Sequence, residues 1–373
     1  MKHRIDTLHA RFGFWVSLFL AFEFLSVFSA RAADPPIVEI PYLDAWASSP
    51  HAKRDAEAFR HWDKDGKVEE ACARCHSTAG FRDFIGADGS TPWGVDKAPP
   101  TAGGIECVAC HNDVTRYLDH VTFPSGLEVT ELGDESRCMW CHQGRESTVS
   151  VNKTVSGLPE DGVNAELKFV NIHYRAAAAT RFGTEAKGAY EYEGQTYAGV
   201  YEHDEGIEAC IDCHNPHTTK ISVEDCAVCH RNVKSEEDFV NIRELPGDFD
   251  GDGNVEEGIA FEIKGLHEAL LAAISTYAKE ISGKAIGYNA DTYPYFFVDG
   301  DGSGAIEKSE AAFKNKFDAW TPRLLKAAYN YQFVAKDPGA FTHNPVYVIE
   351  ILHDSLADLK TKVSIAMDGM ERP

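Results

Sequence analysis

The sequence predicts a mainly α-helical protein with much irregular loop, built from two domains that follow a short N-terminal leader. Two observations predict this fold class. A five-residue sequence motif, Cys-x-x-Cys-His, occurs five times between residues 72 and 230. Each copy of this motif is called a word below. After residue 245 the words stop, and apolar residues recur at helical spacing between acidic loops. We therefore expect a first domain over residues 33–245 and a second, smaller helical domain over residues 246–373.

The leader, residues 1–32, has the pattern of a cleaved export signal. A basic start precedes an apolar run over residues 12–28, and Ala30-Arg31-Ala32 then offers small residues that suit a signal peptidase. The run contains Glu23 and is shorter than the roughly 20 apolar residues that a spanning helix needs. We expect cleavage near Ala32, no later membrane span, and a location in the periplasm, at the cell surface or outside the cell.

The charge balance excludes one class of partner. The chain has 59 acidic and 36 basic residues, a formal net charge of −23. Such a surface repels nucleic acid. It predicts basic or calcium-bridged partner proteins and salt-sensitive docking.

The cysteines decide the chemistry. All ten belong to five pairs, and a histidine follows each pair at once, in CARCH, CVACH, CMWCH, CIDCH and CAVCH. Disulfides and zinc knuckles also use paired cysteines, but neither requires this histidine, whereas covalent c-type haem attachment does. We expect the two thiols of each word to form thioethers with one porphyrin and the histidine to be the proximal iron ligand. The expected haem-attaching residues are Cys72, Cys75, Cys107, Cys110, Cys138, Cys141, Cys210, Cys213, Cys226 and Cys229, and the proximal ligands are His76, His111, His142, His214 and His230.

On these words the sequence resembles multihaem c-type cytochromes over roughly residues 60–232. The stretches CARCHSTAGFRDFIGADGS and FVNIHYRAAAATRFGTEAKGAYEYEGQTYAG look like those of large exported cytochromes of anaerobic, metal- or partner-respiring microbes. The resemblance implies five haem c groups in residues 33–245. It also implies short helices at the words, joined by loops, because porphyrins supply much of the core.

The remaining histidines can fill the second axial position of each iron. Nine lie outside the words and the leader, and methionine is scarce, so bis-histidine ligation at all five haems is feasible. We predict the distal ligands His61, His173, His203, His217 and His343. His217 is too close to His214 to serve the same haem, so we expect it to ligate a neighbouring one. His343 instead caps a helix or reaches another subunit if it does not ligate in its own chain.

Two acidic loops in residues 246–373 predict calcium sites. Residues 299–310, DGDGSGAIEKSE, match an EF-hand loop with a turn glycine at Gly304. Its expected ligands are Asp299, Asp301, Ser303, the Ala305 carbonyl, Glu307 and Glu310. A second loop over residues 248–259 has Ile259 where the bidentate glutamate belongs, so Glu257 or Glu262 would have to close it. Its expected ligands are Asp248, Asp250, Asp252, Asn254 and Glu256.

Three classes of function remain open. The leading one is a non-enzymatic relay of electrons along five closely packed haems, either as a periplasmic shuttle or in extracellular electron transfer, where copies could stack into a filament. Its partners would be redox proteins or other copies of the chain. A pentahaem reductase of nitrite or hydroxylamine needs one open iron, and the lysine that replaces a proximal histidine in such enzymes is absent here. A calcium-sensing or adhesive module would leave five haems without a role.

Overall fold

The computed structural model describes residues 39–101, 103–204 and 206–373. The predicted leader lies outside these residues. The chain divides after Leu43, and everything below concerns the unit that begins at Asp44. No helix among the described residues is long and apolar enough to cross a membrane.

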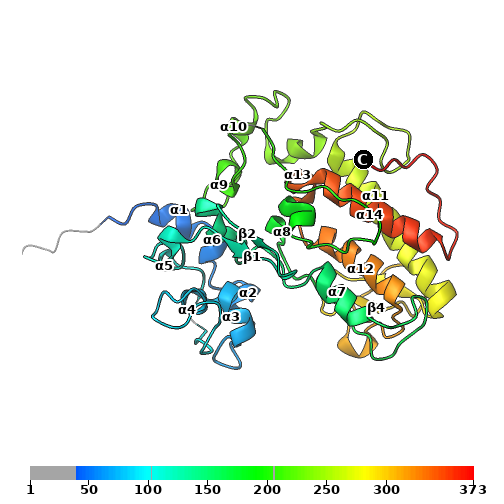
Figure 1. The fold of residues 1–373 in the computed structure, drawn as a ribbon, viewed down its shortest axis with the longest axis horizontal. Coiled ribbons are helices and arrows are strands. Elements are labelled where there is room, and N and C mark those ends of the chain that lie inside the picture. The colour runs from blue at the N-terminus through cyan, green and yellow to red at the C-terminus, as the bar shows by residue number, and fades with distance from the viewer. Residues whose placement is uncertain (1–38, 102, 205) are drawn as a thin grey trace, which may run out of the picture. The chain divides into compact units, whose positions relative to one another are not determined.

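The region that carries the words consists mainly of helices of one or two turns joined by loops (Figure 1). In chain order its helical elements are α1 (Leu43–Ala47), η1 (Pro50–Ala52), α2 (Glu57–Arg60), α3 (Glu70–His76), α4 (Thr78–Phe84), α5 (Cys107–Cys110), η2 (Thr115–Tyr117), η3 (Gly133–Glu135), α6 (Ser136–Met139), α7 (Thr148–Val155), α8 (Ala177–Phe182), η4 (Gly183–Glu185), α9 (Cys210–Cys213), α10 (Val223–Cys226) and η5 (Glu236–Asn241). A two-stranded antiparallel ribbon, β1 (Val121–Thr122) and β2 (Glu128–Val129), lies between η2 and η3. The predicted mainly helical fold with irregular loops is confirmed.

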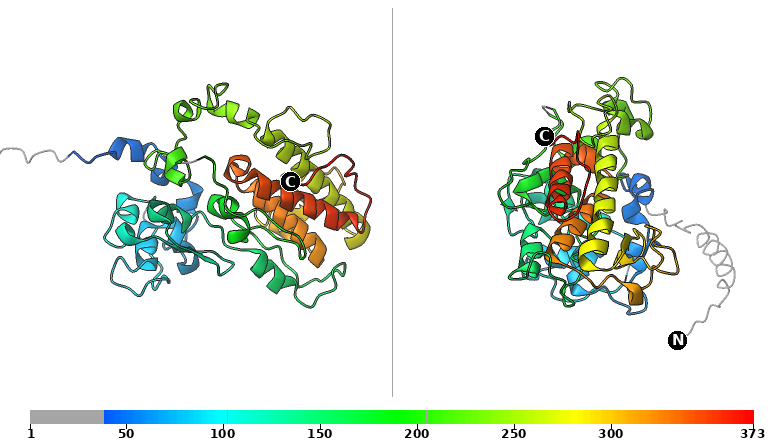
Figure 2. Two further views of the ribbon diagram at one scale, coloured as in Figure 1. Left: turned by 45° about the horizontal axis from the view of Figure 1, so that its top comes forward. Right: turned by 90° about the vertical axis from the view of Figure 1, so that its right-hand side faces the viewer.

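The last third of the chain contains the long helices. Its elements are α11 (Ile259–Tyr277), the π-helical turn η6 (Ala278–Ser282), β3 (Ile286–Tyr288), β4 (Phe296–Val298), η7 (Phe313–Asn315), α12 (Pro322–Ala335), α13 (Ala340–His343) and α14 (Pro345–Lys360). Helices α11, α12 and α14 pack against one another, and Figures 1 and 2 show them side by side in yellow, orange and red. Strands β3 and β4 form a second antiparallel ribbon.

Local sequence sets the starts of the long helices. The apolar spacing predicts a helix from about Phe313, but α12 begins only at Pro322. Proline disfavours helical backbone in the residue before it and fits the first helical turn, so the helix starts at the proline. The Thr321 side chain caps this end by accepting a hydrogen bond from the Leu324 backbone nitrogen. Asn344 caps α14 in the same way, ahead of Pro345.

One hydrophobic core joins the long helices to the segment between the third and fourth words. Buried residues from Phe81 to Val363 belong to a single cluster. The Tyr329 hydroxyl donates to the Gly188 carbonyl at 2.7 Å, and the buried Asn330 side chain bonds both the backbone nitrogen and the carbonyl of Tyr190. The predicted boundary at residue 245 stays a prediction, and buried residues from both sides of it share this core.

Replacing Asn330 by alanine should therefore destabilise the protein. The change leaves the buried backbone groups of Tyr190 without their partners, and we expect the free energy of unfolding to fall by about 2–3 kcal/mol. Denaturant unfolding followed by far-UV circular dichroism measures this. Asn152→Ala, at an exposed position of α7, is the matched control and should change stability by less than about 0.5 kcal/mol. Equal effects of the two changes would show that Asn330 does not anchor the segment.

Candidate haem and metal sites

Each Cys-x-x-Cys-His word closes one helical turn. In four words the histidine backbone nitrogen donates to the carbonyl of the first cysteine, at 2.8–3.0 Å. In the first word the whole sequence lies inside α3. Residues three apart in a helical turn lie on one face, so the two thiols of a word point to the same side. All ten cysteines are free thiols, as attachment to a porphyrin requires.

Three of the five word histidines are oriented by backbone carbonyls, whereas Nδ1 of His230 lies 3.9 Å from the Glu244 carboxylate. Nδ1 of His76 lies 2.8 Å from the Ala58 carbonyl, and Nδ1 of His142 lies 3.1 Å from the Arg175 carbonyl. His214 makes the same contact with the Thr219 carbonyl at 3.2 Å. A carbonyl only accepts, so Nδ1 carries the proton and Nε2 keeps its lone pair for a metal.

Four word histidines face a second histidine at the spacing that one shared iron requires. An imidazole nitrogen lies about 2 Å from the metal it ligates, so two rings on opposite sides of one ion have centroids roughly 6 Å apart. The observed centroid distances are 5.8 Å for His76 and His173, 6.1 Å for His111 and His217, 6.4 Å for His142 and His51, and 5.9 Å for His230 and His203. These residues therefore fit haem iron between them.

Burial keeps several of these rings in the form that binds metal. Removal from water lowers the pKa of His142 and of His173 to about 4, and burial also lowers the pKa of His51. A neutral imidazole has the lone pair that a ligand needs, so no proton has to leave at pH 7.

Three of the five histidines predicted as distal ligands are thus brought to a word: His173, His203 and His217. The structure places the other two elsewhere. His61 is mostly exposed, bonds Glu57 at 2.9 Å and stacks edge-on to Trp62. His343 bonds Asp337. The distal assignment stays a prediction.

His51 is the residue that sequence reasoning did not select. Its carbonyl accepts a hydrogen bond from the Ile105 nitrogen at 2.8 Å, and a side chain at Gly104 would come within 1.9 Å of that carbonyl. Only glycine allows this approach, so the Gly103-Gly104 pair is the one feature of the sequence that hints at a close backbone contact here. It does not reveal which residue makes that contact, so His51 could not be selected from the sequence.

The remaining histidines outside the leader have other partners. His267 stacks on the Tyr331 ring at 3.9 Å, and its Nε2 lies 2.8 Å from the Tyr331 carbonyl. His120 packs edge-on against Trp93 and lies beside Asp119, and His353 lies beside Asp354.

Cysteines of different words lie close to one another. The thiols of Cys75 and Cys141 are near enough to interact, and so are those of Cys138 and Cys210. Cys110 is near enough to Cys138, and Cys213 to Cys226, for their charges to interact. The third word therefore neighbours the first, second and fourth, and the fourth neighbours the fifth.

The loop over residues 299–310 gathers the oxygen atoms that the sequence predicts. Carboxylate oxygens of Asp299, Asp301 and Glu310 lie within 4.8 Å of one another. Ser303 Oγ lies 3.1 Å from the Ala305 carbonyl and 3.3 Å from Glu307. The loop follows strand β4 rather than a helix, so the helix–loop–helix arrangement of an EF-hand is not formed on its N-terminal side.

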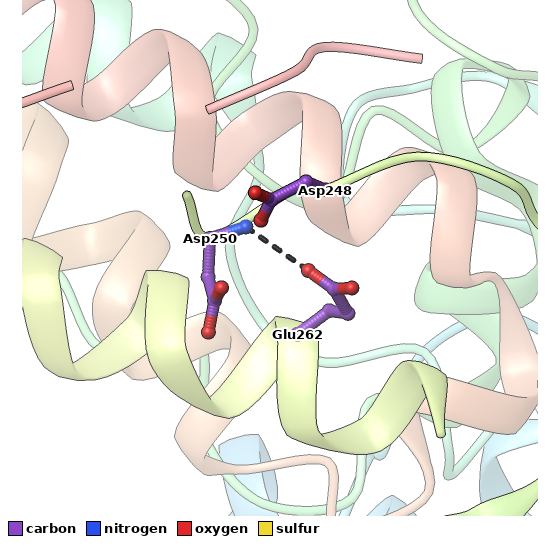
Figure 3. Close-up of side chains that lie close together, drawn as sticks. All are labelled: Asp248, Asp250 and Glu262. Atoms are coloured by element: carbon purple, nitrogen blue, oxygen red, sulfur yellow. Dashed lines mark hydrogen bonds between the residues drawn. The ribbon is translucent and has the colours of Figure 1, made fainter. Parts of the chain in front are cut away.

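The second acidic loop is closed by a residue of α11. Glu262 is fully buried, and one of its oxygens accepts from the backbone nitrogens of Phe249 and Asp250 at 2.8 and 3.1 Å. Figure 3 shows this carboxylate beside Asp248 and Asp250. Arg243 pairs with its other oxygen at 2.7 Å. Asp252 and Glu257 form a second acidic group with Asp250.

Of the other predicted ligands in this loop, Asn254 donates to Glu257 at 3.3 Å, and Glu256 donates its backbone nitrogen to Asn254. Burial raises the pKa of Asp250, and the carboxylates beside it add to that rise. A bound cation would relieve this repulsion.

Comparison with known proteins agrees with the interpretation of the Cys-x-x-Cys-His words as haem-attachment motifs. Residues 57–143 match the family described as cytochrome c7 and related cytochrome c. The chain is 26% identical over 365 residues to the C-type polyheme cytochrome OmcB of Geobacter sulfurreducens, an alignment that covers 81% of this chain and 45% of that protein. These matches support a multihaem c-type cytochrome.

A second relative gives the same result. The C-type polyheme cytochrome OmcC of the same organism is 25% identical over 366 residues, covering 79% of this chain and 43% of its own length. The chain therefore spans less than half the length of the curated relatives it matches. No solved structure matches it.

Proposed function

We propose that the chain is a non-enzymatic electron-transfer protein that relays electrons along five bis-histidine haems between redox partners outside the cytoplasm. The observation that carries the proposal is the set of four histidine pairs, each joining a word histidine to a second ring about 6 Å away. At these four words two protein ligands would leave no open axial position for a substrate. Bound haem supplies reversible one-electron chemistry.

The contacts between attachment thiols support a relay. They bring the first and second words to the third, the third to the fourth and the fourth to the fifth. Electron tunnelling falls steeply with separation, so words whose cysteines lie close together are the arrangement that a relay needs. The third word is central to this arrangement, because its cysteines lie near those of the first, second and fourth words.

The charge of the chain and its leader indicate where the relay would work and with which partners. The export pattern in residues 1–32 and the net charge of −23 favour extracellular electron transfer to proteins with basic or calcium-bridged docking faces. Periplasmic shuttling uses the same relay. Stacking of copies into a filament would extend it from chain to chain.

Haem counting and spin state test the relay. We expect five haems per chain by pyridine haemochrome and only low-spin ferric signals in low-temperature EPR of the purified protein. Serine at both cysteines of one word should remove one haem. A high-spin haem that binds nitrite or CO in the unmodified protein would instead favour the reductase.

Removing His51 distinguishes the histidine pairs found in the structure from the distal ligands predicted from the sequence. His51→Ala should convert one ferric haem from low spin to high spin and allow the reduced haem to bind CO, because the ring facing His142 is lost. His61→Ala is the control: its side chain is 63% exposed, pairs with Glu57 and packs edge-on against Trp62, so we expect no new high-spin signal. The opposite result would favour His61 as the ligand.

We also propose that both acidic loops bind calcium and that the ion stabilises the fold. In the second loop Glu262 takes the closing place that Ile259 cannot fill, with Asp248 and Asp250 beside it. Calcium is abundant outside the cytoplasm, so sites of modest affinity stay occupied there and add their binding energy to the folded state.

Glu310→Gln tests the loop over residues 299–310. Glu310 stands at the position of the bidentate ligand, so we expect at least about tenfold weaker binding at this site. Titration calorimetry of the calcium-free protein should find two sites in the unmodified chain and one at the original affinity in the variant. Glu280→Gln, an exposed change of equal charge in η6, should leave both sites intact. An unaltered calcium titration in Glu310→Gln would contradict the assignment.

A further inference from the structure

Lys336 is a buried cation next to the histidine that faces the first word. It stands at the C-terminal end of α12, and only 6% of its surface is exposed. Its Nζ lies 4.1 Å from the centre of the Tyr174 ring and 4.0 Å from that of Tyr295, and it donates to the Ala290 carbonyl at 3.0 Å. Lysine is almost never fully buried without such partners. The fold therefore holds this charge in one place.

Three contacts connect Lys336 with the segment of His173. The Lys336 carbonyl accepts the Arg175 backbone nitrogen at 2.9 Å. The Tyr174 hydroxyl lies 2.6 Å from that of Tyr295, so the two rings that contact the ammonium group are joined. The Tyr174 ring also packs edge-on against the His173 ring, with the ring centres 5.1 Å apart. One aromatic ring thus separates the positive charge from the His173 ring.

A second cation, Arg145, lies beside the same histidine. Its backbone nitrogen donates to the Ile172 carbonyl at 3.0 Å, one residue before His173. Burial chiefly lowers the pKa of His173 to about 4, and nearby charges, including those of Arg145 and Lys336, lower it further. Burial raises the pKa of the Cys72 thiol, and the Arg145 charge opposes that rise. Arg145 therefore acts both on an attachment thiol of the first word and on the ring that faces this word.

Lys336 keeps its charge at neutral pH. Burial lowers its pKa to about 8, and the charge of Asp291 opposes that fall. Most molecules therefore carry the ammonium group at pH 7. A positive charge near an iron favours the ferrous state, because that state has one positive charge fewer than the ferric state. Such a charge raises the reduction potential of the haem.

The charges beside the third and fifth words are different. Burial lowers the pKa of His142 to about 4, and the charges of Arg175 and Asp337 change this pKa in opposite directions. Nδ1 of His230 lies 3.9 Å from the Glu244 carboxylate, a negative charge that favours the ferric state. At the first word, by contrast, both cations act in the same direction.

We propose that Lys336 and Arg145 raise the reduction potential of the haem at the first word above those of the other haems, so that electrons entering the relay elsewhere collect there. The proposal rests on the proposed relay function. The two cations act through the His173 ring, whose centre lies 5.8 Å from that of His76, so this pair fits haem iron between its rings.

The position of the first word in the relay agrees with this role. Sγ of Cys141, in the third word, lies 3.7 Å from the Arg74 carbonyl, and its thiol is near enough to Cys75 to interact. The third word in turn neighbours the second and the fourth. Electrons reach the first word through the third, and a haem of higher potential holds them until an acceptor takes them. The first word is thus the delivery end of the relay.

Lys336→Met tests the tuning, because methionine keeps much of the apolar stem and removes the charge. In a spectroelectrochemical titration of the five-haem protein, we expect one haem to shift to lower potential and four to stay unchanged. Lys336→Arg keeps the charge and should keep the original potential. Lys264→Met, at an exposed lysine of α11 that pairs with Glu268, is the control for loss of one charge and should shift no single haem. Identical titrations of Lys336→Met and the unmodified protein would overturn the proposal.

Removing the first haem assigns the shift to its site. Serine at Cys72 and Cys75 should remove the haem of highest potential from the titration. In that four-haem protein Lys336→Met should no longer change any potential, whereas it should still do so when Cys226 and Cys229 are replaced instead. A shift that survives loss of Cys72 and Cys75, or loss of a haem that is not the one of highest potential, would overturn the assignment.

Arg145→Gln tests the same proposal if Lys336→Met fails to bind five haems. We expect the same haem to shift to lower potential, by less than in Lys336→Met, because Arg145 is exposed and solvent screens its charge. An unchanged titration of Arg145→Gln would contradict the role of this cation. Five low-spin haems in the unmodified protein would leave the relay intact in either case.

Discussion

The proposed relay depends on one constraint that the structure meets at four of the five words: the word histidine faces a second histidine that the chain supplies from elsewhere. The word itself is local, because one helical turn sets its two thiols and its histidine. The second ring is not, and His173 faces His76 across a separation of 97 residues. Holding such pairs near 6 Å needs a rigid frame, since an error of one or two ångströms would leave an iron with a single ligand. The fold around the words is that frame.

The long helices supply much of the frame's rigidity. The segment between the third and fourth words, which carries His173 and α8, has little regular structure of its own. Helix α12 fixes it through Tyr329 and Asn330, and Glu350 of α14 accepts the Ala198 nitrogen at 2.7 Å. Packing among α11, α12 and α14 is thereby transmitted to the segment that carries His173 and α8. In the proposed relay, a helical region without any word thus helps to position a histidine that faces a word.

The sequence predicts what is encoded within about a dozen residues. The five words, the acidic loop from Asp299 to Glu310 and the amphipathic spacing of α11 and α14 are of this kind. The start of α12 was missed because Pro322 overrides the apolar spacing that begins at Phe313. Glu262 could only be named as one of two substitutes, since its place in the second loop depends on how α11 packs.

Long-range pairing lies beyond such reasoning. His51 and His61 have similar polar neighbours in sequence, yet only the first faces a word. What separates them is the close backbone approach of Gly104 to His51, a tertiary contact. The same contact matters for packing, because a β-carbon at Gly104 would come within 1.9 Å of the His51 carbonyl and force a shift there. In the proposed relay, the position of the ring that faces His142 of the third word therefore depends on backbone packing just before the second word, and the two sites are coupled through the fold rather than through the chain between them.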